Sequence, residues 1–162
     1  VGMRKRANGH IWMAAQEFYN AGELIWNAEY VNFDAYLGPL LVNYAFSCEL
    51  SLKASEGKVK GSEVSPEGIL SPVNIESVVR GHDLKLIFEK LEQETQRVIK
   101  LEFVSSTNQQ LIPLLRECAN YFENGRYSFE KKASGYNLTS VRTLAKGLLD
   151  AVRAFGISQG NQ

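Results

Sequence analysis

The chain has 162 residues, which is enough for one domain with a hydrophobic core. Lys plus Arg number 18 and Asp plus Glu also number 18, so the formal net charge is zero and argues against a strongly electrostatic partner such as duplex DNA or an anionic membrane. No apolar run approaches the roughly 20 residues needed to cross a bilayer, so we expect no membrane association.

The first predicted helix spans about residues 9–29 and carries two adjacent apolar stripes. One stripe supplies a face for the core of the bundle. The other stripe contains Trp12, Tyr19 and Trp26. It is either a second core contact or the surface of a homodimer.

The second predicted helix, residues 36–54, is apolar around most of its circumference, which indicates a helix surrounded by others. Pro39 is expected in its first turn, where a missing N–H costs no hydrogen bond, and Asp34 is expected to cap it. Its only charged residues are Glu49 and Lys53, which lie one helical turn apart in the favourable order.

Residues 55–81 read as a long surface connection rich in glycine, serine and proline. Within it, Ser71-Pro72 is expected to start a short helix that continues to Val79. No segment of the chain alternates apolar and polar residues over the length of a strand, so we predict no β-structure. A connection this long inside a compact domain is typically functional or partly disordered.

A third helix is predicted over residues 84–101, with Asp83 as its cap. A fourth begins near residue 111 and ends at Asn124-Gly125, where Gly125 is expected to take the left-handed conformation. The proline at position 113 makes this helix either start late or kink early.

The fifth helix is capped by Asn137 or Thr139 and buries an apolar face as far as Phe155, after which the chain is expected to fray from Gly156. Five amphipathic helices with mostly short connections predict an all-α fold, an up-and-down bundle of about five helices. We expect residues 1–162 to form one such domain, with an ordered core at about 10–155.

Two cysteines, Cys48 and Cys118, occupy apolar helical positions and have no CxxC partner. This pattern indicates buried free thiols and a reducing, cytoplasmic location. The only histidines are His10 and His82, without an HxxxH spacing, so we expect no metal site and no cofactor.

Three short clusters stand out from the helical pattern. They are Glu-Leu-Ser-Leu-Lys at residues 49–53, Gly-His-Asp-Leu at residues 81–84 and Gly-Arg-Tyr at residues 125–127. In this order, separated by helices of these lengths, they make roughly residues 10–155 resemble the HEPN domain superfamily, in the branch with Glu-x-x-x-Lys and Gly-His-Asp-Leu motifs.

The resemblance implies a bundle of four to five helices, frequent homodimerisation, and nucleotide or RNA binding. It also implies one of two functional roles. Many members are metal-independent ribonucleases that act as toxins or defence effectors, and others are non-catalytic partners of small nucleotidyltransferases.

The nuclease members carry an arginine separated by four to six residues from a histidine, late in the bundle. There the histidine moves a proton at the RNA 2′-OH while the arginine stabilises phosphate charge. This chain has Arg126 at the comparable place, but the positions where the histidine would stand hold Lys131, Lys132 and Ala133. A literal match from Arg4 to His10 precedes the first helix and is interpreted as chance.

We therefore expect a non-catalytic HEPN-like domain that forms a homodimer and binds a nucleotide, an RNA segment or a protein partner such as a nucleotidyltransferase. The candidate ligand-binding residues are Glu49, Lys53, His82, Asp83, Arg126 and Tyr127. A buried Glu49 would require polar partners, so these residues alternatively form a structural polar cluster. Two other functions stay open: a metal-independent HEPN ribonuclease using His82 or His10, and a structural protein-interaction module without a small ligand.

Overall fold

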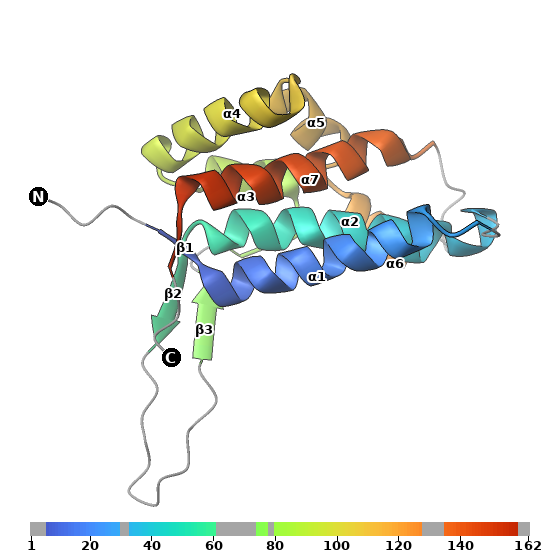
Figure 1. The fold of residues 1–162 in the computed structure, drawn as a ribbon, viewed down its shortest axis with the longest axis horizontal. Coiled ribbons are helices and arrows are strands. Elements are labelled where there is room, and N and C mark those ends of the chain that lie inside the picture. The colour runs from blue at the N-terminus through green and yellow to red at the C-terminus, as the bar shows by residue number, and fades with distance from the viewer. Residues whose placement is uncertain (1–5, 30–32, 61–73, 78–79, 128–134, 159–162) are drawn as a thin grey trace, which may run out of the picture.

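The computed structural model describes residues 6–29, 33–60, 74–77, 80–127 and 135–158, and most of these are α-helical (Figure 1). The all-α prediction is confirmed. The helices are α1 (Gly9–Trp26), α2 (Phe33–Ala54), α3 (Leu84–Glu89), α4 (Gln93–Thr107), α5 (Leu111–Glu117), α6 (Tyr121–Arg126) and α7 (Leu138–Phe155). The short strands are β1 (Ala7–Asn8), β2 (Gly57–Lys60), β3 (Asn74–Ser77) and β4 (Ile157–Ser158).

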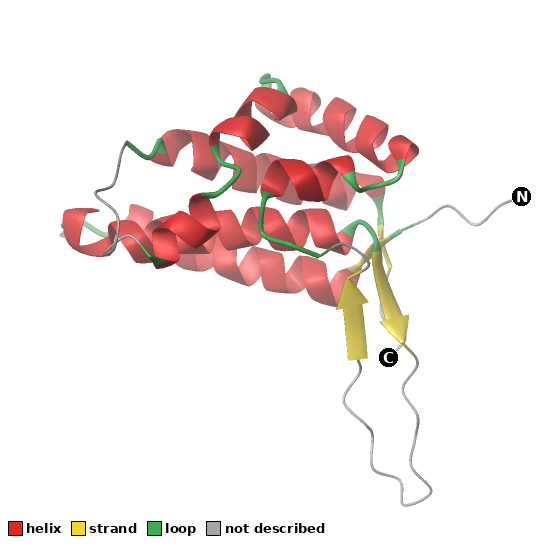
Figure 2. Cartoon of the chain, turned by 180° about the vertical axis from the view of Figure 1, so that it is seen from behind, coloured by secondary structure: helices red, strands yellow, loops and turns green. Residues whose placement is uncertain are grey.

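Helix α2 is the centre of the bundle. It packs against α1, α3, α6 and α7, while α4 packs on α7 (Figure 1). Figure 2 shows the opposite face, where shorter helices and their loops cover the long ones. The expected apolar circumference of α2 is confirmed by its fully buried side chains, Leu40, Leu41, Tyr44, Ala45, Cys48 and Leu52.

The start of α2 differs from the prediction. The helix begins at Phe33, so Pro39 lies inside it rather than in its first turn, and Asp34 lies within the helix rather than at its cap. The amide hydrogen that Pro39 lacks would have bonded the carbonyl one turn earlier. The sequence pattern did not reveal the extra turn before Pro39, because a proline most often marks the first turn of a helix.

The predicted third helix is two helices. α3 ends at Glu89 and α4 begins at Gln93. The buried carboxylate of Glu56, just after α2, accepts a hydrogen bond from the backbone N–H of Glu92 at 2.6 Å. This contact holds the start of α4 against the end of α2, and no periodic pattern in the sequence reveals it.

The predicted fourth helix is also divided, into α5 and α6. Gly125 lies inside α6 and does not have a positive φ, so the predicted left-handed end is wrong. Close packing, and not backbone conformation, explains why a glycine stands at this position. An added Cβ at Gly125 would lie 3.0 Å from Val42 and 3.3 Å from Leu41, where α6 crosses closely over α2.

The connection after α2 contains a β-ribbon. β2 and β3 pair antiparallel, with Gly57 opposite Ser77 and Lys60 opposite Asn74. The prediction of no β-structure is therefore wrong here, and so is the short helix predicted for residues 71–79 where it includes residues 74–77. The rest of that helix lies outside the described residues. Strands of four residues are at the lower limit of the length over which alternation indicates a strand, so their signal is weak.

The segment before α1 and the segment after α7 lie side by side. β1 pairs parallel with β4, with Ala7 opposite Ile157, and the N–H of Ala7 donates to the carbonyl of Gly156 at 2.7 Å. The predicted fraying is wrong for residues 156–158, because this pairing holds them.

The predicted caps are confirmed for two helices. The side chain of Asp83 accepts from the N–H of Leu86 at 2.9 Å at the start of α3. Asn137 accepts from the N–H of Ser140 at 3.0 Å at the start of α7.

Cys48 and Cys118 are buried free thiols, as predicted. Burial raises the pKa of Cys48 well above its usual range and that of Cys118 to about 12. Among the described helices, none combines the length and the apolar character that crossing a membrane requires.

Candidate functional site

A buried carboxylate joins α2 to the loop before α3. Glu49 is only 2% exposed, and each of its oxygens has one partner among the described residues. Oε1 accepts from Nζ of Lys53 at 2.6 Å, one helical turn along α2. Oε2 lies 3.0 Å from Nδ1 of His82, which is 33 residues away in the chain and 43% exposed. The structure thus brings together three of the predicted site residues.

The Gly-His-Asp sequence explains why His82 reaches Glu49. Gly81 has a φ of 111°, a conformation that glycine adopts without strain. Asp83 then caps α3, and the N–H of Leu84 donates to the carbonyl of Ala119 at 3.1 Å. The loop is therefore fixed on both sides of His82. Asp83 is a cap in this structure, and a role for it in ligand binding stays a prediction.

An aromatic ring from α6 extends the site. The Phe122 ring lies 5.1 Å from the His82 ring and 4.9 Å from the ring of Phe46, with which it stacks. The guanidinium of Arg126 lies on the same Phe122 ring, at 5.4 Å. Phe122 thus connects the Glu49–His82 pair to the third predicted cluster.

Arg126 and Tyr127 form the exposed side of this site. The Arg126 guanidinium lies 5.3 Å from the centre of the Tyr127 ring, and its Nη2 donates to the Tyr127 hydroxyl at 3.4 Å. Tyr127 is 44% exposed. We call the set Glu49, Lys53, His82, Phe122, Arg126 and Tyr127 the Glu49–His82 site.

Sequence reasoning missed Phe46 and Phe122. The signal was present, because Phe46 precedes Glu49 by three residues and Phe122 precedes Arg126 by four, so each pair shares a helix face. By sequence alone both phenylalanines are typical core positions, and both do pack in or against the core. Their second role is to hold the rings and charges of the site against one another.

The chemistry of the site follows from the Glu49–His82 contact. A neutral His82 that donates from Nδ1 to the carboxylate keeps Nε2 as a free acceptor, and a protonated His82 offers Nε2–H as a donor. The ring can therefore bind an oxygen of a ligand or exchange a proton with it. Within the described ranges no cluster of three or more metal-ligating side chains exists.

A second polar cluster, which joins residues distant in the sequence, links α1, α2 and α7. Glu23 accepts from Nε of Arg142 at 2.7 Å, from Nη2 of Arg142 at 2.9 Å and from the Tyr44 hydroxyl at 2.6 Å. The Trp26 ring lies 4.6 Å from the guanidinium. The hydrogen bonds from Arg142 lower the pKa of Glu23 to about 2, and burial raises the pKa of Tyr44.

This cluster predicts a loss of stability in acid. Because the pKa of Glu23 is lowered from 4.5 to about 2 by folding, its contribution is complete above the unfolded value and is lost as the pH falls toward 2. Allowing for the partial exposure of Arg142, we expect a loss of about 1–2 kcal/mol between about pH 6 and pH 3. Urea unfolding at several pH values measures it. Glu23→Gln should lose less over the same range, and an equal loss in this variant would contradict the assignment.

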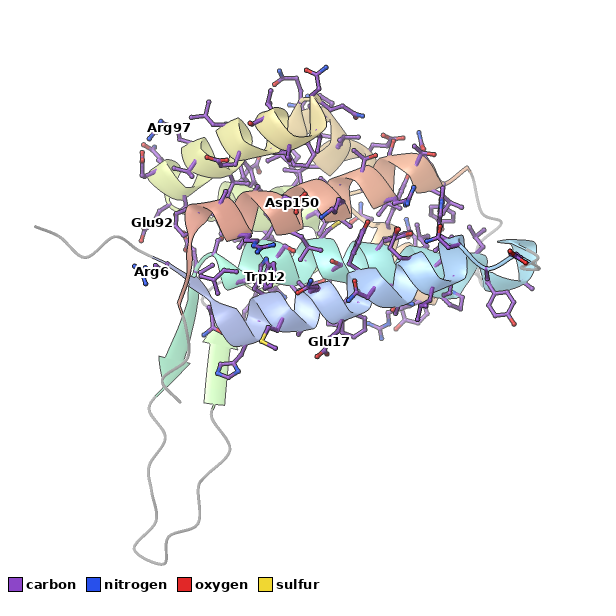
Figure 3. All side chains as sticks on the ribbon, viewed as in Figure 1. Arg6, Trp12, Glu17, Glu92, Arg97 and Asp150 are labelled. Carbon is purple, nitrogen blue, oxygen red and sulfur yellow. The ribbon has the colours of Figure 1, made fainter. Side chains whose placement is uncertain are left out.

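The aromatic stripe of α1 faces the bundle. Nε1 of Trp12 donates to the carbonyl of Leu149 at 3.1 Å, and Figure 3 shows Trp12 between α1 and α7. The rings of Tyr19 and Trp26 lie 5.9 Å and 6.5 Å from that of Tyr44. All three stripe residues are half-buried against the core. They are thus a core contact, and a part for them in a homodimer remains a prediction.

Comparison with models of known protein families, with curated proteins and with solved structures found no match for the chain. The HEPN resemblance therefore remains a hypothesis that depends on the three motifs.

Proposed function

We propose that the chain is a non-catalytic HEPN-like domain whose Glu49–His82 site binds a nucleotide, free or within single-stranded RNA. The observation that supports this most is the shared Phe122 ring. The ring contacts both His82, from the loop before α3, and Arg126, from α6, although they come from distant segments of the chain. A histidine and an arginine that contact the same ring suit a phosphate group.

The charge of Arg126 is available to a ligand. Among the residues that the structure describes, Arg126 has no acidic partner, whereas Lys53 is paired with Glu49. The rings of Phe122 and Tyr127 orient the guanidinium without neutralising it. The exposed Tyr127 ring offers a face on which a base can stack. Phosphate and base of one nucleotide can therefore be bound by neighbouring residues.

We expect Arg126→Ala and Tyr127→Leu each to weaken nucleotide binding by about tenfold, because a stacked base or a charged hydrogen bond contributes 1–3 kcal/mol. Fluorescence anisotropy with a labelled oligoadenylate measures this. The matched control is Arg116→Ala, which removes another exposed arginine, from α5. Equal weakening by Arg116→Ala would indicate non-specific attraction to charge and would contradict the proposal.

A metal-independent ribonuclease is the second candidate, and the Glu49–His82 contact is what favours it. A carboxylate that binds Nδ1 orients the imidazole so that Nε2 can act as a general base. The assay is cleavage of RNA in the presence of a chelator. Cleavage that is lost in both His82→Ala and Arg126→Ala would replace the non-catalytic proposal with this one. Intact RNA, bound by the wild type, supports binding alone.

The third candidate is a structural interaction module. It predicts that His82→Ala lowers the melting temperature but leaves partner binding unchanged, because Glu49 then only ties α2 to the loop before α3.

The homodimer and a nucleotidyltransferase partner belong to the same HEPN hypothesis. Light scattering across a range of concentrations tests the homodimer, and a strictly monomeric protein would remove that part of the proposal.

A further inference from the structure

A groove lies between the polar face of α7 and the C-terminal end of α4, and no residue of the Glu49–His82 site lines it. Its volume is about 400 Å³, within the range of sites that bind small molecules. α7 lines it with residues spaced three or four apart on one face, Thr139, Arg142, Thr143, Lys146 and Asp150. Tyr19 of α1 and the Ser106–Gln109 segment complete the lining.

Arg142 is held in a fixed orientation at this groove. Two of its five N–H groups donate to Glu23, and the Trp26 ring supports the guanidinium. Among the described residues the remaining three N–H groups have no protein partner. An arginine fixed in this way loses little freedom when it binds a ligand. Its free edge is preorganised for an oxyanion.

The rest of the α7 side supplies further donors. Lys146 pairs with Asp150, at 2.9 Å, and with no other residue that the structure describes; both side chains are exposed. Such a pair is weak, so Lys146 can turn toward an anion. The hydroxyl groups of Thr139 and Thr143 have no hydrogen bond to any other described residue, and each can donate one.

The α4 side supplies acceptors instead. Ser106 and Thr107 both donate their hydroxyl hydrogens to the carbonyl of Phe103, at 3.2 Å and 2.7 Å. Their oxygens can then only accept, and Thr107 already accepts from the N–H of Gln109 at 3.1 Å. Ser106 and Gln109 both line the groove, and their side-chain oxygens can accept hydrogen bonds from a ligand.

We propose that this groove binds a small phosphorylated molecule that carries free hydroxyl groups, such as a sugar phosphate. The phosphate binds the free edge of Arg142 and Lys146, with Thr143 as a further donor. The hydroxyl groups of the ligand donate to Ser106 and Gln109 across the groove. Nucleotide binding at the Glu49–His82 site does not depend on this groove, because the two sites share no residue.

Calorimetry with ribose 5-phosphate on the whole chain tests the inference, with ribose and inorganic phosphate as separate probes. We expect saturable binding of ribose 5-phosphate, weaker binding of phosphate and none of ribose. Thr143→Val and Lys146→Ala should each weaken binding by about fivefold, roughly the value of one hydrogen bond or exposed charge. Both leave the Glu23–Arg142 contact in place.

Two variants separate this groove from other sites. Arg97→Ala, at an exposed position of α4, should bind ribose 5-phosphate as the wild type does. Arg126→Ala, in the Glu49–His82 site, should lose only binding that Thr143→Val and Lys146→Ala leave unchanged. No saturable binding, or equal losses in Arg97→Ala and Lys146→Ala, overturns the inference. If inorganic phosphate binds as tightly as ribose 5-phosphate does, the proposal that the ligand is a sugar phosphate is overturned. Loss of ribose 5-phosphate binding in Arg126→Ala alone would assign the ligand to the Glu49–His82 site and would also overturn the inference.

Discussion

Replacing Gly147 with valine is expected to lower the free energy of unfolding by about 3 kcal/mol, the largest effect that we predict for a single apolar substitution. Gly147 lies where α7 meets α4. An added Cβ would stand 2.6 Å from the Cγ2 of Thr107 and 2.8 Å from Cδ2 of Phe103. Phe103 is fully buried, so its ring has no free space into which to turn.

The matched control is Ala154→Val, which places the same side chain at an exposed position of the same helix. We expect it to cost only about 0.5 kcal/mol, the difference in helix propensity. Urea unfolding of both variants, followed by circular dichroism, gives the comparison. If the two valine variants lose similar amounts of unfolding free energy, α4 and α7 do not pack as closely at Gly147 as described here.

Glu49→Leu is the second large prediction. We expect a loss of about 2–3 kcal/mol, because Lys53 and His82 lose the carboxylate that pairs with them while part of each side chain stays out of water. We expect this loss of stability to be small for a broken buried ion pair, because His82 is partly exposed. Glu89→Gln, which breaks the Lys85–Glu89 pair at an exposed glutamate, is the control and should change stability by less than about 0.5 kcal/mol.

A double variant separates stability from binding. Glu49→Leu with Lys53→Met replaces the buried ion pair by apolar side chains and should recover much of the lost stability. It should not recover nucleotide binding, because His82 still lacks the carboxylate that orients its ring. If the double variant binds nucleotide as the wild type does, the Glu49–His82 contact is only structural.

The long helices were predictable because each needs only a local pattern. The apolar circumference of α2 and the amphipathic face of α7 are visible in the sequence, and Asn137 marks where α7 starts. The division between α3 and α4 was not predictable. It depends on Glu56, which bonds the N–H of Glu92 36 residues later. The apolar pattern continues across that break, so periodicity alone describes one long helix.

The candidate site was predictable only in part. The Glu49–Lys53 pair follows from helical spacing, and the Asp83 cap follows from its position before an apolar run. The contact between Glu49 and His82 is between distant segments, and only the family resemblance suggested it. The Glu23–Arg142 pair joins residues 119 positions apart and has no local signal at all.

The imidazole resonances of the two histidines test the central claim most directly. His82 belongs to the Glu49–His82 site, whereas His10 is exposed at the start of α1, so the chain contains its own control. Two-dimensional NMR of histidine-labelled protein, titrated with adenosine monophosphate and then with a short single-stranded RNA, follows both rings. We predict a saturable shift of the His82 resonances with no change at His10. If neither ring shifts, or if both shift alike without saturation, the Glu49–His82 site does not bind nucleotides.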